Sequence, residues 1–452
     1  MKAINPATDE IIWDYPEHTV ADVHDIIGMT DEAQKNWRTT TFAHRSQLMH
    51  QAAVVLRENV DKYARLITIE MGKIINESKA EVEKCAWVCD YYADNAEKFL
   101  ADEMVQTDGS RSFVAFEPLG VVLAVMPWNF PFWQVFRFAA PALMAGNGGV
   151  LKHASNVPGC ALAIEEIFRE AAFPENIFRT MLISSKLVEE AIKDWRIKAV
   201  TLTGSEPAGM SVAAAAGREL KKTVLELGGS DPFIVLDDAD LPACVATSAT
   251  ARMINAGQSC IAAKRFIVVK SIVKEFEKQQ TAIMQSLKVG DPLDPSTKVG
   301  AMARTDLLEE LHEQVQHSIE MGAKLLCGGK RADRVGAFYE PTVLTNVRKG
   351  MPAYEQETFG PVSAIIPVKD AEEGIAVAND SVFGLGGSLW SKDLKKAEAL
   401  ARRIETGAIF INGMTKSDPR LPFGGIKRSG YGRELSHYGI KEFVNIKSIW
   451  IA

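Results

Sequence analysis

The sequence has few of the features that mark secreted, membrane or nucleic-acid-binding proteins. Its 452 residues include only six cysteines, and their scattered spacing predicts no disulfide framework. The polar start MKAINPATDE leads into no signal-like apolar run, and the longest uncharged apolar stretch, LGVVLAVMPWNFPFW, is short and contains two prolines. Basic residues do not predominate, since 51 Lys and Arg stand against 58 Asp and Glu. These absences predict a cytoplasmic protein without a membrane segment or a nucleic-acid partner.

The patterning that is present predicts a large α/β protein. Hydrophobic residues make up 47% of the chain and charged residues 24%, which is typical of globular proteins with more than one domain. Residues 19–100 are predicted to be mainly helical, whereas strands alternate with helices over 127–236 and again over 232–412. Strands that are apolar on both faces and alternate with helices predict parallel sheets covered on two sides, with ligand sites at strand carboxyl ends and between the lobes.

Three stretches place polar residues where such sites form. In TLTGSEPAG, a strand ends at Gly204-Ser205 and a helix begins, which suits a pyrophosphate, although a plain strand–turn–helix fits equally. In PWNFP, two prolines bracket Asn129, whose amide can donate to an oxyanion or simply cap a helix. In VLELGG, Glu226 ends an apolar strand, where burial would raise its pKa and make it a base, unless it points to solvent.

Cys260 gains its interest from these neighbours. A lone cysteine is more often an inert core residue than a nucleophile. Here it lies in a loop of small residues, NAGQSC, and the chain also offers a base, an oxyanion donor and an anion-binding helix start. Together these groups indicate thiol chemistry on a carbonyl beside a dinucleotide.

Seven motifs in order along the chain resemble the aldehyde dehydrogenase superfamily, and the style of the sequence is similar to its short bacterial succinate-semialdehyde dehydrogenases. They are PWNFP, LK at 151–152, TGSEPAG, LELGG, NAGQSC, ETFGPV and PFGGIKRSGYGRE. The resemblance implies that Cys260 is the nucleophile, that Glu226 is the base, and that Asn129 and the Cys260 N–H form the oxyanion hole. The implied reaction is oxidation of an aldehyde to an acid through a thiohemiacetal and a thioester on Cys260.

The cofactor implied by the resemblance is a nicotinamide dinucleotide. Positions that match cofactor-contacting residues of the family are Trp128, Lys152, Gly204, Ser205, Leu227, Glu357 and Phe359. Many relatives have Lys-Pro-x-Glu where this chain has Lys152-His153-Ala154-Ser155, and their Glu repels the 2′-phosphate of NADP. Ser155 removes that charge, so we predict a preference for NADP with NAD still usable.

The substrate implied by the resemblance carries a second carboxylate. Arg137, eight residues after Asn129, matches an arginine that holds the far carboxylate in succinate-semialdehyde dehydrogenases, although a structural ion pair is an equal alternative. The complete set of predicted substrate-binding residues is Arg137, Trp133, Ser259, Ser417 and Phe423, with Arg420 as a further anion binder. A second arginine of some relatives is replaced here by Ile254. We expect succinate semialdehyde, with glutarate semialdehyde and short aliphatic aldehydes as alternatives.

The fold implied by the resemblance has a Rossmann-like dinucleotide-binding domain, an α/β catalytic domain and a small oligomerisation sheet. We expect the dinucleotide-binding domain at residues 1–105 and 127–228, the catalytic domain at 229–435, and the oligomerisation strands at 106–126 and 436–452, in a homodimer or homotetramer.

Two other functions are disfavoured. A CoA-acylating enzyme is disfavoured because Glu226 is present, and a non-catalytic binding protein would not need Cys260, Glu226 and Asn129 together.

Overall fold

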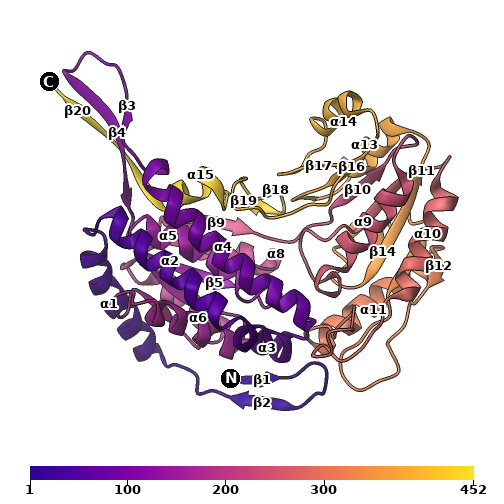
Figure 1. Cartoon of the computed structure of the whole chain (residues 1–452), viewed down its shortest axis with the longest axis horizontal. Coiled ribbons are helices and arrows are strands. Elements are labelled where there is room, and N and C mark those ends of the chain that lie inside the picture. Colours follow the sequence, from indigo (N-terminus) through magenta and orange to yellow (C-terminus); the bar gives the residue numbers. More distant parts are fainter.

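The first hundred residues form a layer of helices in the computed structural model, which describes all residues 1–452 (Figure 1). The long helices are α1 (Val20–Trp37), α2 (Phe42–Glu58), α3 (Val60–Met71) and α4 (Ile75–Phe99), preceded by a hairpin of β1 (Lys2–Ile4) and β2 (Ile11–Asp14). At the start of α1, the Thr19 hydroxyl accepts from the Asp22 N–H while the Asp22 carboxylate accepts from the Thr19 N–H. The predicted helical region therefore begins at a capping box.

The first alternating series folds into a six-stranded sheet with the order β19-β9-β8-β5-β6-β7. Its five parallel strands are β5 (Val121–Met126), β6 (Gly148–His153), β7 (Phe178–Thr180), β8 (Ile197–Thr203) and β9 (Lys222–Glu226). They alternate with α5 (Trp133–Met144), α6 (Pro158–Glu170), α7 (Val188–Lys193) and α8 (Glu206–Arg218). Since the strands are parallel, the residues that follow β5, β8 and β9 meet at one edge.

The second series forms a seven-stranded sheet with the order β12-β13-β14-β11-β10-β16-β17. The strands are β10 (Pro232–Val235), β11 (Arg265–Val269), β12 (Lys324–Cys327), β13 (Thr342–Thr345), β14 (Val362–Val368), β16 (Ser388–Trp390) and β17 (Phe410–Ile411). The accompanying helices are α9 (Leu241–Met253), α10 (Val273–Ser286), α11 (Thr305–Glu320), α12 (Pro352–Glu355), α13 (Ala371–Asn379) and α14 (Leu394–Ala401). Only β12 is antiparallel to its neighbour, so this sheet also matches the predicted α/β pattern.

A three-stranded arm projects from the body of the molecule (Figure 1). It consists of β3 (Glu103–Met104), β4 (Arg111–Pro118) and β20 (Val444–Ile451), with β4 in the middle. The segment 106–126, predicted to serve oligomerisation, spans two sheets: β4 lies in the arm, whereas β5, which begins after Gly120, lies in the six-stranded sheet. The reason is burial: almost all of β5 is solvent-inaccessible, whereas β20 is largely exposed.

Segments from the end of the chain return to the first sheet. The short strand β19 (Gly430–Tyr431), which lies within the predicted catalytic segment 229–435, pairs with β9 instead of joining the second sheet. It follows a small sheet of β15 (Phe383–Gly384) and β18 (Ile426–Lys427) and precedes α15 (Ser436–Ile440). This return places the 413–435 loop region against the helices of the first half.

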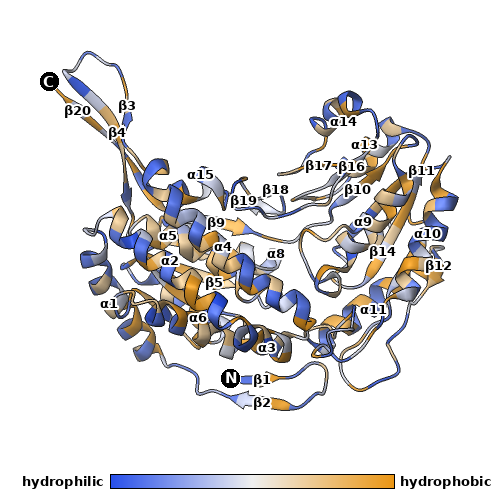
Figure 2. Cartoon of the chain, in the orientation of Figure 1, coloured by the Kyte–Doolittle hydropathy of each residue, from blue (hydrophilic) through white to orange (hydrophobic).

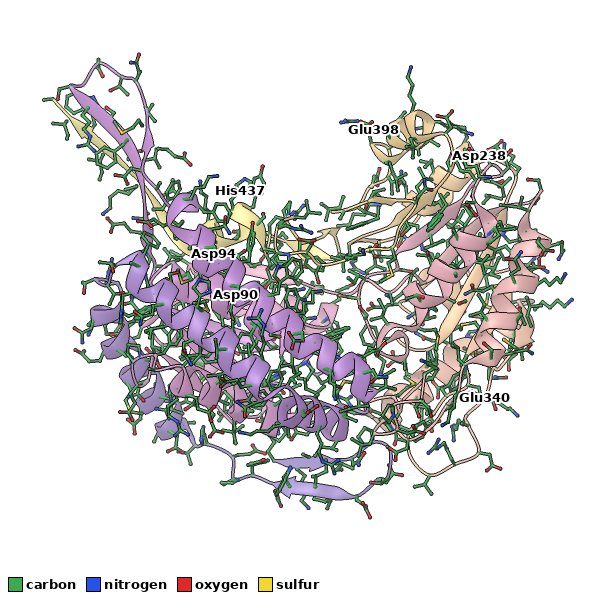
Figure 3. The ribbon with its side chains drawn as sticks, in the orientation of Figure 1. Asp90, Asp94, Asp238, Glu340, Glu398 and His437 are labelled. Carbon is green, nitrogen blue, oxygen red and sulfur yellow. The ribbon has the colours of Figure 1, made fainter.

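The strands supply the apolar interior on both sides of the molecule. In Figure 2 the strands β11 and β14 are mostly in the hydrophobic colour, as expected for parallel strands buried on both faces. Helix α4 is fixed against α2 by His50, whose ring nitrogens lie 2.8 and 3.0 Å from the carboxylates of Asp90 and Asp94 (both labelled in Figure 3). None of the helices combines the length and hydrophobicity that a membrane-spanning segment requires.

Candidate active site

Cys260 lies in a tightly held loop between α9 and β11. It is the only one of the six cysteines that is not fully buried. The loop turns through left-handed backbone at Asn255 (φ 53°) and Ala256 (φ 51°), and then at Gly257 (φ 77°). A Cβ at Gly257 would come within 2.1 Å of the Gly360 carbonyl oxygen, so only glycine fits there. The cysteine is therefore presented by a rigid turn.

A buried lysine fixes the same loop from behind. The Lys264 ammonium donates hydrogen bonds of 2.9, 2.9 and 3.2 Å to the carbonyl oxygens of Ser259, Cys260 and Ala262. It also lies 3.4 Å from the Glu357 carboxylate. The backbone N–H of Cys260 makes no hydrogen bond within the chain, so it can bind a ligand oxygen.

Two cavities meet at Cys260, and no other residue lines both of them. Cavity I, of about 420 Å³, lies toward the carboxyl ends of β5, β8 and β9. Cavity II, of about 370 Å³, lies among α4, α5 and the 413–425 loop. A thiol in this position can contact one ligand from each side.

Cavity I has the features of a dinucleotide site. It begins where β8 passes into α8, whose N-terminal cap Ser205 makes no side-chain hydrogen bond, so the first N–H groups of the helix remain available to an anion. Gly209 allows α8 to lie close to the residue that follows β9, since a Cβ at Gly209 would lie 2.5 Å from the Leu227 side chain. Six of the predicted cofactor residues line the cavity: Trp128, Gly204, Ser205, Leu227, Glu357 and Phe359.

The other two predicted cofactor residues do not line cavity I. Lys152 ends β6 and is paired in register with Val125 of β5, and burial lowers the pKa of its ammonium group. Ser155 follows that strand, is exposed and makes no hydrogen bond. Both lie at the carboxyl end of the strand next to β5, outside the walls that define the cavity.

Asn129 is held beside the thiol by the loop that carries it. The side-chain amide of Asn129 donates one hydrogen bond of 3.1 Å to the Gln258 backbone carbonyl oxygen. The backbone carbonyl oxygen of Asn129 accepts from the Asn255 side chain at 2.8 Å. A side-chain amide has two N–H donors, so the second N–H of Asn129 has no partner in the chain. Because Asn129 lines cavity I together with Cys260, the structure brings a free amide donor and the thiol to the same cavity.

Glu226 lies at the end of β9 and is 2% exposed. Neither of its carboxyl oxygens has a hydrogen-bond partner, and it lines neither cavity. Burial, and then the nearby Glu434 carboxylate, raise the pKa of Glu226 well above its usual range. In this position no hydrogen bond holds the Glu226 carboxyl, and its raised pKa suits a group that exchanges a proton.

All five predicted substrate-binding residues line cavity II: Trp133, Arg137, Ser259, Ser417 and Phe423. The Arg137 guanidinium also forms an ion pair with the buried Glu434, donates to the Thr203 hydroxyl at 3.2 Å and lies 4.5 Å from the Phe423 ring centre. The structural ion pair considered as an alternative for Arg137 is therefore present, while the same residue also forms part of the cavity wall. The exposed Arg420 pairs with Asp418 and does not line the cavity.

The surroundings of Cys260 shift the pKa of its thiol. Burial raises its pKa to about 12, against the opposing effect of the Arg137 and Lys264 cations. A ligand that displaces water and brings a hydrogen-bond donor or a proton acceptor changes this balance. The raised pKa favours the thiol over the thiolate, which is the nucleophilic form.

Sequence reasoning missed three charged residues of this region. Lys264 ties down the Cys260 loop, Glu434 pairs with Arg137, and Lys84 on α4 lines cavity II. Glu434 lies at the end of the motif PFGGIKRSGYGRE and could have been found there. No local signal marks Lys84, which is one of several lysines on a long helix.

A two-sheet α/β fold with a single cysteine between a dinucleotide-type cavity and a second cavity is typical of an oxidoreductase that works through a thiol. The model of the aldehyde dehydrogenase family matches residues 1–449, and the chain belongs to that family. A Synechocystis protein described as a probable NADP(+) succinate-semialdehyde dehydrogenase is 56% identical over 449 residues, covering 99% of each chain. NADP(+) succinate-semialdehyde dehydrogenase 1 of Mycobacterium tuberculosis is 50% identical over 452 residues, again covering 99% of each. A Streptococcus pyogenes succinic semialdehyde dehydrogenase, solved with NADP+, has a TM-score of 0.98 and 42% identity, covering 100% of this chain and 99% of its own.

Proposed function

We propose that this aldehyde dehydrogenase oxidises succinate semialdehyde to succinate with NADP. The observation that carries the proposal is the position of Cys260, the one residue common to cavity I and cavity II. Cavity I offers N–H groups to a pyrophosphate, whereas cavity II has cationic side chains in its wall. The relatives named above carry the same activity in their names.

Cys260 forms the covalent intermediates in this proposal. The Cys260 thiol gives up its proton to water, and its sulfur attacks the aldehyde carbonyl carbon. The carbonyl oxygen receives hydrogen bonds from the free N–H of Asn129 and the backbone N–H of Cys260. The residues that line cavity I would hold a nicotinamide dinucleotide there, and it would supply the hydride acceptor when bound. The acyl group then remains on Cys260 as a thioester.

Glu226 serves as the base for the second half of the reaction. Its carboxyl has no hydrogen bond to break, so it can turn from its buried position toward a water beside the thioester. A carboxylate with a raised pKa is a stronger base than an ordinary one, and it takes a proton from that water as the C–S bond is hydrolysed. Transfer of the acyl group to CoA would not need this residue.

The chain's residues fit NADP. The first N–H groups of α8 suit the pyrophosphate, and Lys152 and Ser155 at the end of β6 would lie beside the adenosine ribose, where they offer a cation and a hydroxyl instead of a carboxylate. Ser155→Glu tests this assignment. Two unit charges about 4 Å apart repel by roughly 4 kcal/mol at an effective dielectric constant near 20. Because Ser155 is exposed, solvent screens this repulsion.

We therefore expect the ratio of kcat/KM for NADP to that for NAD to fall about 10- to 100-fold in Ser155→Glu, and Ser155→Ala serves as the uncharged control. A preference for NAD in the unmodified enzyme would contradict the cofactor assignment.

The substrate is tested by comparing aldehydes with and without a distal carboxylate. The panel is succinate semialdehyde, glutarate semialdehyde and butanal, each with NADP and with NAD, followed by formation of the reduced cofactor. We expect kcat/KM for succinate semialdehyde to exceed that for butanal by about 100-fold or more. Equal values would exclude recognition of the carboxylate, and a higher value for glutarate semialdehyde would make that aldehyde the substrate.

The arm accounts for the proposed homodimer or homotetramer. Apolar side chains on it are exposed, among them Met104 (64%), Ile446 (62%) and Trp450 (55%). Burial of such a surface against a second copy of the chain is a common basis of assembly. All six cysteines are free thiols, which supports the proposed cytoplasmic location.

A further inference from the structure

We propose that Lys84 of α4, together with Ser417, binds the distal carboxylate of the substrate in cavity II. The inference rests on the proposed oxidation of an ω-carboxy aldehyde and names the group that selects it. Lys84 and Ser417 both line the cavity that Cys260 also lines, although they lie 333 positions apart in the chain.

The position of the Lys84 ammonium group is fixed by two contacts. It donates a hydrogen bond of 2.7 Å to the Ser417 hydroxyl and lies 4.1 Å from the centre of the Trp133 ring. An ammonium group has three N–H donors, so further hydrogens remain for a ligand. Ser417 accepts from Lys84 and thus keeps its own O–H to donate. One cation and one hydroxyl can in this way bind a single carboxylate.

Lys84 is the partly buried cation of cavity II without a carboxylate partner. Arg137 is paired with Glu434, whereas Lys84 donates to the Ser417 hydroxyl and forms no ion pair with an Asp or Glu. Lys416, the third cation of the wall, is exposed to solvent, so its charge is screened. Withdrawing an unpaired charge from water is costly unless a partner arrives. The carboxylate of an aldehyde that reaches Cys260 through this cavity is such a partner.

The acidic residues of the cavity wall are already engaged elsewhere. The Glu81 carboxylate forms an ion pair with Lys73 and accepts from the N–H groups of Phe132 and Trp133 at 2.9 and 3.0 Å. Asp418 pairs with Arg420 at 2.7 Å, and Glu77 accepts from the Asn255 N–H. None of these carboxylates forms a direct ion pair with Lys84, although Glu81 and Asp418 attract its charge from a greater distance, so a ligand carboxylate can make the direct contact.

The test is a comparison of substrate selectivity in matched variants. Lys84→Met removes the charge but keeps an unbranched apolar stem that can lie against Trp133. Lys79→Met makes the same change on the same helix, at an exposed lysine that pairs with Asp61 and lies outside cavity II. The quantity measured is the ratio of kcat/KM for succinate semialdehyde to that for butanal.

We expect this ratio to fall about 10- to 100-fold in Lys84→Met, mainly through KM for succinate semialdehyde, because a charge-assisted hydrogen bond is lost. The ratio in Lys79→Met stays at the wild-type value. Lys84→Arg, which keeps the charge, recovers most of the ratio.

A pH profile supplies a readout that a purely structural role would not change. Burial, and then the neighbouring Arg137 cation, lower the pKa of Lys84 to about 8, so the ammonium group loses its proton as the pH rises through about 8. The ionisable groups around it are Glu77, Glu81, Cys85, Arg137, Lys416 and Asp418. The pKa of Glu77 is raised to about 7 by burial, that of Cys85 is raised well above its usual value, and that of Asp418 is lowered by Arg420.

We therefore expect the wild-type ratio to fall between about pH 7.5 and about pH 9.5, and to stay level in Lys84→Arg, since a guanidinium keeps its proton throughout. If Lys84→Met proves unstable, the wild-type and Lys84→Arg profiles still decide the matter.

Three outcomes separate the possibilities. A reduced ratio in Lys84→Met with an unchanged ratio in Lys79→Met supports the proposal. A wild-type ratio retained in Lys84→Met, or profiles that do not differ between wild type and Lys84→Arg, overturns the role of Lys84 while the proposed function stands. A wild-type enzyme that shows no preference for succinate semialdehyde over butanal overturns both.

Discussion

Replacing Asn129 with alanine tests whether the loop after β5 contributes to chemistry or only to packing. Asn129 uses one amide N–H to hold the Gln258 carbonyl oxygen at 3.1 Å and leaves the other free in cavity I beside Cys260. Removal of one oxyanion donor costs roughly 3 to 4 kcal/mol of transition-state stabilisation. We therefore expect kcat to fall on the order of 100- to 1000-fold in Asn129→Ala, with a smaller effect on KM.

The same substitution leaves the fold almost unchanged, because the Gln258 carbonyl oxygen keeps a second donor. Asn255 donates to it at 3.2 Å, so the loop loses one of two hydrogen bonds, and the free energy of unfolding falls by about 1 kcal/mol. Steady-state turnover and a single-turnover measurement of cofactor reduction provide the rates, and thermal unfolding provides the stability.

Asn129→Asp extends the series, since a carboxylate at this position repels an oxyanion and lowers kcat further than alanine does. Turnover of Asn129→Ala within about threefold of wild type, at unchanged stability, would remove Asn129 from the oxyanion hole and refute the reasoning.

Three other outcomes follow from the geometry. Glu226→Gln cannot accept a proton from water, so we expect a burst in which about one cofactor per site is reduced rapidly, followed by slow turnover. Loss of both the burst and the turnover would contradict a role of Glu226 that is limited to hydrolysis. The raised pKa of Cys260 predicts that iodoacetamide modifies it about 10- to 100-fold more slowly than a free cysteine at neutral pH. Because only the thiolate reacts, the rate of modification, measured by peptide mapping, should increase about tenfold per pH unit. A rate that does not change with pH would mean that the thiol is already ionised. Ile446→Lys combined with Trp450→Lys places charges on the exposed arm and should yield monomers in sedimentation experiments, and retention of the wild-type oligomer would exclude the arm as the interface.

The sequence alone was sufficient to locate most of the elements, because their signals are local. The Thr19–Asp22 cap, the apolar strands and the glycine-containing turns depend on residues close together in the chain, and they predicted α1 and the strand–helix alternation of both sheets. Short motifs such as NAGQSC and LELGG are also local signals, and the sequence alone was sufficient to find them. The structure places these two motifs near each other at cavity I. Sheet membership was less secure, since β4 and β5 are separated by two residues yet belong to different sheets.

By itself, then, the amino-acid sequence determined the α/β class, the family and the residues with reactive side chains, because residue type and spacing encode these locally. Only the tertiary structure decided which charges are compensated and which remain free. Arg137 meets Glu434 and Lys84 meets Ser417 across hundreds of residues, and Glu226 loses contact with water only when β9 is covered. Ion pairing, desolvation and the meeting of two cavities at one sulfur depend on packing in three dimensions, for which neighbouring residues in the chain carry no signal.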